Sequence, residues 1–257
     1  MEHIATVSRS SGIDKDGDTL KDFKVQEDYR AFLQGKISLY LAIAFESPKQ
    51  STSIISHLVP GLYLASPSIQ HNRLYSVLIS LLHHLVVAYP SQSTFNQHLG
   101  TIPAAFLPRD SAEFQWITSV SKSLRTQNYT SFAMLTRPAH ISQLLDSANC
   151  VRQSQVTSDP GGGGSASVMR QAMNVLVHSL REKARTTTWQ IIRSAYREFS
   201  YTNEGTRTWL THSLFLQSLV PHCKDIGVEK WMEERSALGH ARQKEGVEGR
   251  WLVYKAQ

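Results

Sequence analysis

Six basic residues in the C-terminal third of the chain are the side chains best suited to a binding chemistry. They are Arg170, Arg181, Lys183, Arg185, Arg193 and Arg197. On a helix, Arg170, Arg181 and Arg185 share the face opposite the apolar residues, and Arg193 and Arg197 stand one turn apart. A row of such groups can bind phosphates without reading a base sequence. We therefore expect a nucleic-acid-binding face here, and the alternative is an ordinary solvated helix surface.

The distribution of charge favours the same part of the chain. The sequence has 27 Lys and Arg against 21 Asp and Glu, a formal charge of +6, with an isoelectric point near 9.3. From Met169 onward there are 14 basic and 9 acidic residues, so this segment carries +5 of the +6. A basic surface of this kind attracts acidic partners, nucleic acid among them.

No arrangement typical of catalysis or metal binding is visible. His83 and His84 are adjacent in a leucine-rich stretch without an acidic neighbour, and we expect core or rim histidines. The same holds for His57, His71 and His98. Cys150 and Cys223 are too few for a disulfide scaffold and lack the paired spacing of a zinc site. The chain also lacks the nucleophile elbow and the phosphate-binding loops. We expect a non-enzyme without cofactor, metal or small-molecule substrate, and an enzyme with an unrecognised site stays open as the alternative.

Length and composition indicate a folded chain. Its 257 residues, 41% hydrophobic and 19% charged, can bury two closely packed cores. No apolar run approaches the roughly 20 residues that a bilayer-spanning helix needs. The first residues lack the basic start and apolar segment of a secretory signal. We expect the nucleus and cytoplasm, with no membrane partner.

Short antiparallel helices are predicted for residues 21–153, after a disordered tail over residues 1–20. Apolar residues recur at intervals of three and four, and prolines separate the segments. The predicted helices are 25–33, 37–45, 53–63, 71–88, 92–99, 112–125, 129–135 and 139–153. The broad apolar stripe of 71–88 favours packing on both sides, as in a helical-hairpin, TPR-like solenoid.

A flexible Gly/Ser-rich loop is predicted for residues 154–167, whose sequence is SQVTSDPGGGGSAS. Glycine and serine cost much ordering entropy and bury little apolar surface. A solvent-exposed insertion is the favoured interpretation. A hinge or recognition loop and an expression linker are the alternatives.

Residues 168–257 are predicted to form a helix followed by a winged helix. The threonine triplet Thr186 to Thr188 is interpreted as a boundary, because threonine caps helices better than it continues them. The predicted helices are 168–184, 189–199, 207–220 and 228–238. Trp251 to Tyr254, in GRWLVYK, have the composition of a β-strand. Trp189 and Tyr196 are expected in the core, with a stacking platform as the alternative.

Several motifs resemble PCI-domain proteins of the GANP type. NYTSFAMLTRP resembles the element that ends the helical-repeat half of that family, with Asn128, Tyr129 and Phe132 at the matching positions. KARTTTWQIIRSAYREF resembles the element that follows, and RWLVYK is similar to the wing strand. The matching positions of that second element are Arg185, Trp189, Ile192, Ala195 and Tyr196.

This resemblance, over about residues 112–255, implies a helical stack capped by a winged helix. It also implies a scaffold subunit that binds other protein subunits and RNA in messenger ribonucleoprotein processing or nuclear mRNA export. Subunits of the proteasome lid, the signalosome and initiation-factor complexes share the layout. A subunit of the first two kinds, without RNA contact, therefore stays open as the alternative.

Overall fold

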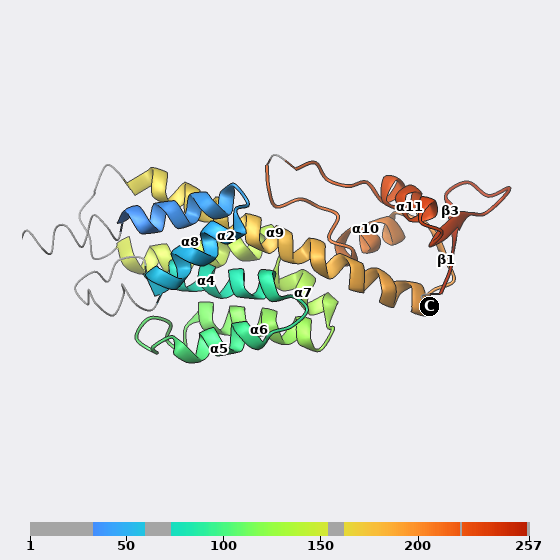
Figure 1. The fold of residues 1–257 in the computed structure, drawn as a ribbon. Coiled ribbons are helices and arrows are strands. Elements are labelled where there is room, and N and C mark those ends of the chain that lie inside the picture. Colours follow the sequence, from blue (N-terminus) through green and yellow to red (C-terminus); the bar gives the residue numbers. More distant parts are fainter. Residues whose placement is uncertain (1–32, 60–72, 154–161, 222, 256–257) are drawn as a thin grey trace, which may run out of the picture.

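The computed structural model describes residues 33–59, 73–153, 162–221 and 223–255 (Figure 1). The protein is mainly helical, and a small three-stranded sheet lies near the C-terminal end of the chain. The predicted tail and the predicted helix 25–33, apart from Leu33, lie outside the described residues. Among the helices that the structure describes, none combines the length and the apolar character needed to cross a membrane.

The N-terminal half consists of helices close to those predicted. They are an initial helix at 33–44, α2 (Pro48–His57), α4 (Arg73–Ala88), α5 (Ser93–Thr101), α6 (Ala112–Arg125), α7 (Tyr129–Leu135) and α8 (Pro138–Gln153). Two boundaries differ from the prediction. Gly35 lies inside the first helix, and α2 begins at Pro48 because proline fits a first turn, where its missing N–H costs nothing. Side-chain caps fix two of the other starts, since Ser111 accepts from the Phe114 N–H and Asn128 from the Ser131 N–H.

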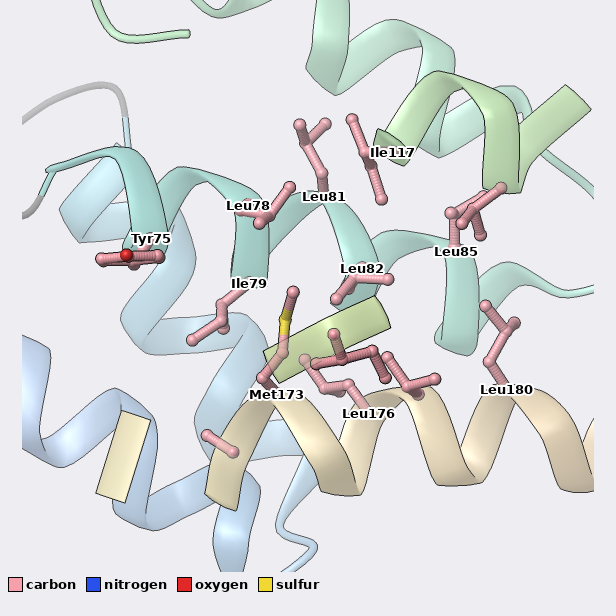
Figure 2. Packing of buried hydrophobic residues seen from close by; sticks show 14 of the residues in the cluster. Tyr75, Leu78, Ile79, Leu81, Leu82, Leu85, Ile117, Met173, Leu176 and Leu180 are labelled. Carbon is pink, nitrogen blue, oxygen red and sulfur yellow. The ribbon is translucent and has the colours of Figure 1, made fainter. Parts of the chain in front are cut away.

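Helix α4 lies at the centre of the larger core. Its leucine-rich stripe is buried against α5 and α6 on one side and against α9 (Gly162–Ala195) on another. Figure 2 shows Leu82 of α4 facing Met173 and Leu176 of α9. Such two-sided burial is what the broad apolar stripe of the sequence predicts. We call the part that surrounds this core the helical body.

Helix α9 is one continuous helix of 34 residues, about 50 Å long at 1.5 Å per residue. Two predictions are wrong here. The threonine triplet lies inside the helix, where the Thr188 hydroxyl donates to the Ala184 carbonyl at 3.0 Å. The predicted loop does not extend to residue 167, because the helix already begins at Gly162. The helix leaves the helical body and runs into the C-terminal part of the chain (Figure 1).

The C-terminal part contains the sheet and two short helices, and we call it the C-terminal module. Its elements are β1 (Glu198–Ser200), α10 (Glu204–Ser213), α11 (Val228–Ala237), β2 (Ala241–Gln243) and β3 (Arg250–Val253). The sheet is antiparallel in the order β1-β3-β2, with Trp251 paired to both Phe199 and Gln243. The late strand at Trp251 to Val253 is confirmed. β1 and β2 were not predicted, and the predicted helix 189–199 ends at Ala195.

A second core holds the C-terminal module together. It contains Trp189 from the end of α9, Leu210 from α10, Trp231 from α11 and Trp251 from β3. Alternate residues of β3 are buried, so one face of the sheet covers this core. Trp189 and Trp231 meet edge to face with ring centroids 6.4 Å apart.

The segment after α10 connects the two cores. The predicted helix 207–220 ends at Ser213, and Phe215 has a left-handed backbone with φ of 53°. Leu214 and Leu216 belong to the core of the module, whereas Phe215 and the residues 219–220 belong to the core of the helical body. Phe215 meets Phe132 of α7 edge to face at 5.2 Å. The chain therefore inserts one aromatic ring from the module into the body.

Candidate interaction surface

Two of the six predicted phosphate-binding residues are buried. Arg185 donates from Nε to the Leu214 carbonyl and from Nη2 to the Phe215 carbonyl, each at 2.8 Å, and lies over the Trp231 ring. Arg181 lies over the Phe215 ring, and among the described residues its Nε and Nη1 have no hydrogen-bond partner. Burial lowers the pKa of both guanidinium groups, to about 10 for Arg181. Arg185 thus holds two carbonyls directly after the end of α10, and neither side chain offers an open phosphate contact.

The other four basic residues lie at three separate places. Arg170 forms an ion pair of 2.7 Å with Asp146 of α8, and Lys183 donates to the carbonyl of Val86. Arg193 donates to the Tyr254 and Lys255 carbonyls beyond the end of β3. The exposed Arg197 joins this third place, because its own carbonyl accepts from the N–H of Val253 in β3.

The predicted continuous basic face is therefore divided. Its middle serves the packing of the segment after α10. At the end near β3 a small cluster of cations remains, in which Arg197 is exposed and Arg193 is half-buried. Arg193 and Arg197 form this cluster with Lys255, and His240 has a lowered pKa there because burial and the charge of Arg193 disfavour its protonation. We call Arg193, Arg197 and Lys255 the β3-end cluster.

A groove that the sequence does not reveal lies between the helical body and the C-terminal module. It has a volume of about 420 Å³ and opens between α7, the last turns of α9, and α10. Four of its large apolar side chains are exposed: Met134 by 56%, Ile191 by 40%, Tyr196 by 47% and Trp209 by 36%. Such a cluster of exposed apolar side chains in one depression is typical of a binding site. We call this depression the α7–α10 groove.

Tyr196 was expected in the core, and this expectation is wrong, because Tyr196 is exposed together with Trp209. Their rings pack on each other with centroids 5.2 Å apart, and both pack against the buried Phe199. The inner face of this aromatic group completes the core of the module, and its outer edge forms one end of the groove. Periodicity places both residues on the apolar side of their helices but does not tell whether another element covers that side.

The groove carries the positive charge of Arg137 and no negative side chain. Neither an Asp nor a Glu lines it. Within the described part of the chain, the Arg137 guanidinium has no hydrogen bond or ion pair. A second depression of about 340 Å³ shares Gln127 and Tyr129 with the groove, contains Arg125, and likewise has no acidic lining residue.

Hydroxyl groups line the second depression. Tyr89 Oη lies 3.2 Å from Tyr129 Oη and 3.3 Å from Thr187 Oγ1. Burial, followed by the interaction with Tyr89, raises the pKa of Tyr129 well above its usual value. Tyr129 therefore keeps its proton and can donate a hydrogen bond to a ligand or to Tyr89.

The histidines of α4 and α5 form a cluster instead of standing alone. His83 Nε2 lies 2.9 Å from Thr52 Oγ1, and His98 Nε2 lies 2.9 Å from Ser80 Oγ. The rings of His84 and His98 are 4.4 Å apart. Burial lowers the pKa of both His83 and His98 to about 4. Their hydroxyl partners indicate a structural role.

The described ranges contain no group of side chains that resembles a metal site. No three His, Cys, Asp or Glu side chains come close enough there to hold a metal ion. Of the two cysteines, Cys223 is an exposed free thiol. The most distinctive surface features of the described residues are the α7–α10 groove and the β3-end cluster.

Comparison with known proteins yields no relative. No protein-family model, no curated protein and no solved structure matches this chain.

Proposed function

We propose that this chain is a non-enzymatic PCI scaffold subunit that binds protein partners and RNA in messenger ribonucleoprotein processing or nuclear mRNA export. The observation that carries the proposal is the order of elements in the C-terminal module. The end of α9 is followed by β1, α10, α11, β2 and β3, with the sheet order β1-β3-β2. A winged helix has this order, with residues 244–249 as the wing between its last two strands. On this proposal, the helical body is the TPR-like solenoid and the site of action is the nucleus and cytoplasm.

The connection between the two parts supports a scaffold. α9 belongs to both cores, and the segment after α10 returns to the helical body through Phe215. Two parts joined by a shared helix and a shared aromatic contact present partner sites in a fixed relative orientation. A subunit that organises a larger complex requires this property.

The charges of the module favour the β3-end cluster as the proposed RNA contact. α11, which occupies the place of a recognition helix, carries Glu229, Glu233 and Glu234 beside Lys230 and Arg235, so it is not a cationic surface. Arg193 and Arg197, by contrast, remain candidates for the phosphate contacts that the sequence predicts. They can contact phosphates together with Lys255, without reading the bases.

The first test is binding of a fluorescein-labelled oligouridine to the full chain at increasing salt. We expect log Kd to rise linearly with log salt. The double variant Arg193→Glu/Arg197→Glu should bind more weakly and reduce the slope by about 1 to 1.5, since each lost phosphate contact removes about 0.7 for a single strand. The control is Lys122→Glu, which reverses one charge at an exposed position of α6. This variant should bind as the unaltered chain does.

A PCI subunit of the proteasome lid or signalosome type, without RNA contact, is the second candidate. The mixed charge of α11 and the burial of Arg181 and Arg185 favour it. Absence of salt-dependent oligouridine binding would select this candidate. Affinity purification with and without ribonuclease distinguishes them further, because only an RNA-linked scaffold should lose part of its partners on ribonuclease treatment.

A further inference from the structure

We infer that the α7–α10 groove binds an acidic peptide segment of a partner protein, with apolar anchor residues next to at least one carboxylate. This inference rests on the proposed scaffold role and names the chemistry of one partner. It concerns a surface distinct from the β3-end cluster, where the RNA contact is proposed.

The first argument is the apolar character of the groove. Met134 comes from α7, Ile191 from α9 and Trp209 from α10, so three elements contribute exposed apolar area to one depression. Its volume of about 420 Å³ can hold a few large side chains. Burial of exposed apolar area stabilises a complex by roughly 25 cal/mol per Å². An apolar anchor residue of a partner would bury the area in this groove.

The second argument is charge complementarity. Arg137 lines the groove, and Arg125 lies in the depression that adjoins it, whereas acidic side chains are missing from both linings. The guanidinium of Arg137 has no partner among the described residues. A carboxylate placed beside the anchors would pair with this arginine. A basic or purely apolar partner would leave the guanidinium without a counter-ion.

The same features favour a peptide over a nucleic acid strand. Ala133, Met134, Ile191, Ile192 and Ala195 give the groove an aliphatic floor, which suits leucine or phenylalanine better than a nucleobase. The rings of Tyr196 and Trp209 already pack against each other and against Phe199, in edge-to-face and tilted arrangements. One lining arginine cannot neutralise a strand that carries a phosphate at every nucleotide. A groove between helices is also the usual receptor for an amphipathic helix.

The test is selection of a random peptide library displayed on phage against the immobilised full chain, followed by titration of the labelled consensus peptide. We expect enriched sequences with two apolar anchors at helical spacing and an Asp or Glu beside them. Met134→Lys should weaken the consensus peptide by at least about tenfold, the loss expected for a central anchor contact. Phe45→Lys is the matched control, because Phe45 is also exposed but lies in the turn after the first helix, outside the groove.

A charge exchange makes the test specific to Arg137. Arg137→Glu should weaken the acidic consensus peptide by at least about tenfold. A second peptide carries lysine in place of the acidic residue. The Arg137→Glu variant should bind this second peptide more tightly than the unaltered chain does. The variant should fold, since Arg137 is exposed and precedes the first turn of α8, where a carboxylate favours the helix dipole.

Three results would overturn the inference. The first is enrichment of peptides without acidic residues. The second is an affinity of the consensus peptide for Met134→Lys equal to that for the unaltered chain. The third is displacement of the consensus peptide from the groove by oligouridine. The peptide site can also fail by itself. If the selection yields no groove-binding peptide, while oligouridine binding depends on salt and is weakened by Arg193→Glu/Arg197→Glu, the peptide site is refuted and the proposed function stays in place.

Discussion

At the scale of single residues, the two buried arginines have opposite energetic roles. Arg185 satisfies two carbonyls at the end of α10, so Arg185→Met should leave both without a donor and lower the free energy of unfolding by about 2 to 4 kcal/mol. Arg181 buries two nitrogen atoms without partners among the described residues, so Arg181→Met should cost less than about 1 kcal/mol or stabilise the fold. Urea unfolding of both variants measures the difference. Equal losses would show that Arg181 has a favourable partner in the folded chain.

The histidine cluster predicts a dependence of stability on pH. The pKa of His83 is lowered from 6.5 to about 4, so between these values the unfolded chain binds a proton that the folded chain does not. Stability should therefore fall as pH decreases, with His83 contributing a loss of about 2 kcal/mol between pH 7 and pH 5.

Urea unfolding at the two pH values tests this expectation. His83→Gln, which keeps a polar group near Thr52, should make the loss smaller by about that amount. His140→Gln, at an exposed position of α8, serves as the control and should leave the loss unchanged. An unchanged pH dependence in His83→Gln would mean that the folded chain binds the proton as readily as the unfolded one.

At the scale of elements, the amphipathic helices of the helical body and the strand β3 could be predicted, whereas the three-residue strands β1 and β2 could not. α4 and α6 repeat their apolar residues over three or more turns, and proline or a capping residue marks most ends. β1 and β2 have three residues each, too few for a period-two pattern. β1 also follows directly on a helical pattern, which extended the predicted helix through Phe199.

The threonine triplet shows how tertiary packing overrides a local preference. Threonine is a weak helix former by only a few tenths of a kcal/mol, and α9 gains more than this by burying Ala184 and Trp189 on either side. The polar groups of the triplet also find partners inside a helix, as Thr188 does with Ala184. The preference that suggested a boundary is real but small.

The candidate site was predictable only in part, because it depends on contacts between distant segments. Spacing placed Arg181 and Arg185 on the polar side of α9, but the segment after α10 covers that side. In the same way, Tyr196 and Trp209 have apolar positions that no further described element covers. Helical periodicity gives the direction of a side chain relative to its own helix. Burial depends on what the rest of the chain brings to that side.

At the scale of the whole molecule, Phe215 is expected to make the two parts unfold together. Its ring is fully buried against Phe132 in the core of the helical body, although the residues on both sides of it belong to the module. Phe215→Ala removes this shared contact, with an expected loss of about 3 to 5 kcal/mol. This contact couples the helical body to the C-terminal module. Its loss should therefore lower the cooperativity of unfolding as well as the free energy of unfolding.

Calorimetry and tryptophan fluorescence can separate these two effects. The unaltered chain should unfold in one transition, whereas Phe215→Ala should show two, with Trp231 and Trp251 reporting on the module. Phe95→Ala removes a ring of the same size that is buried only in the helical body, and it should lower the Tm without splitting the transition. Two transitions in the unaltered chain would mean that α9 and Phe215 do not couple the parts. The relative orientation of the α7–α10 groove walls would then no longer be fixed by the fold.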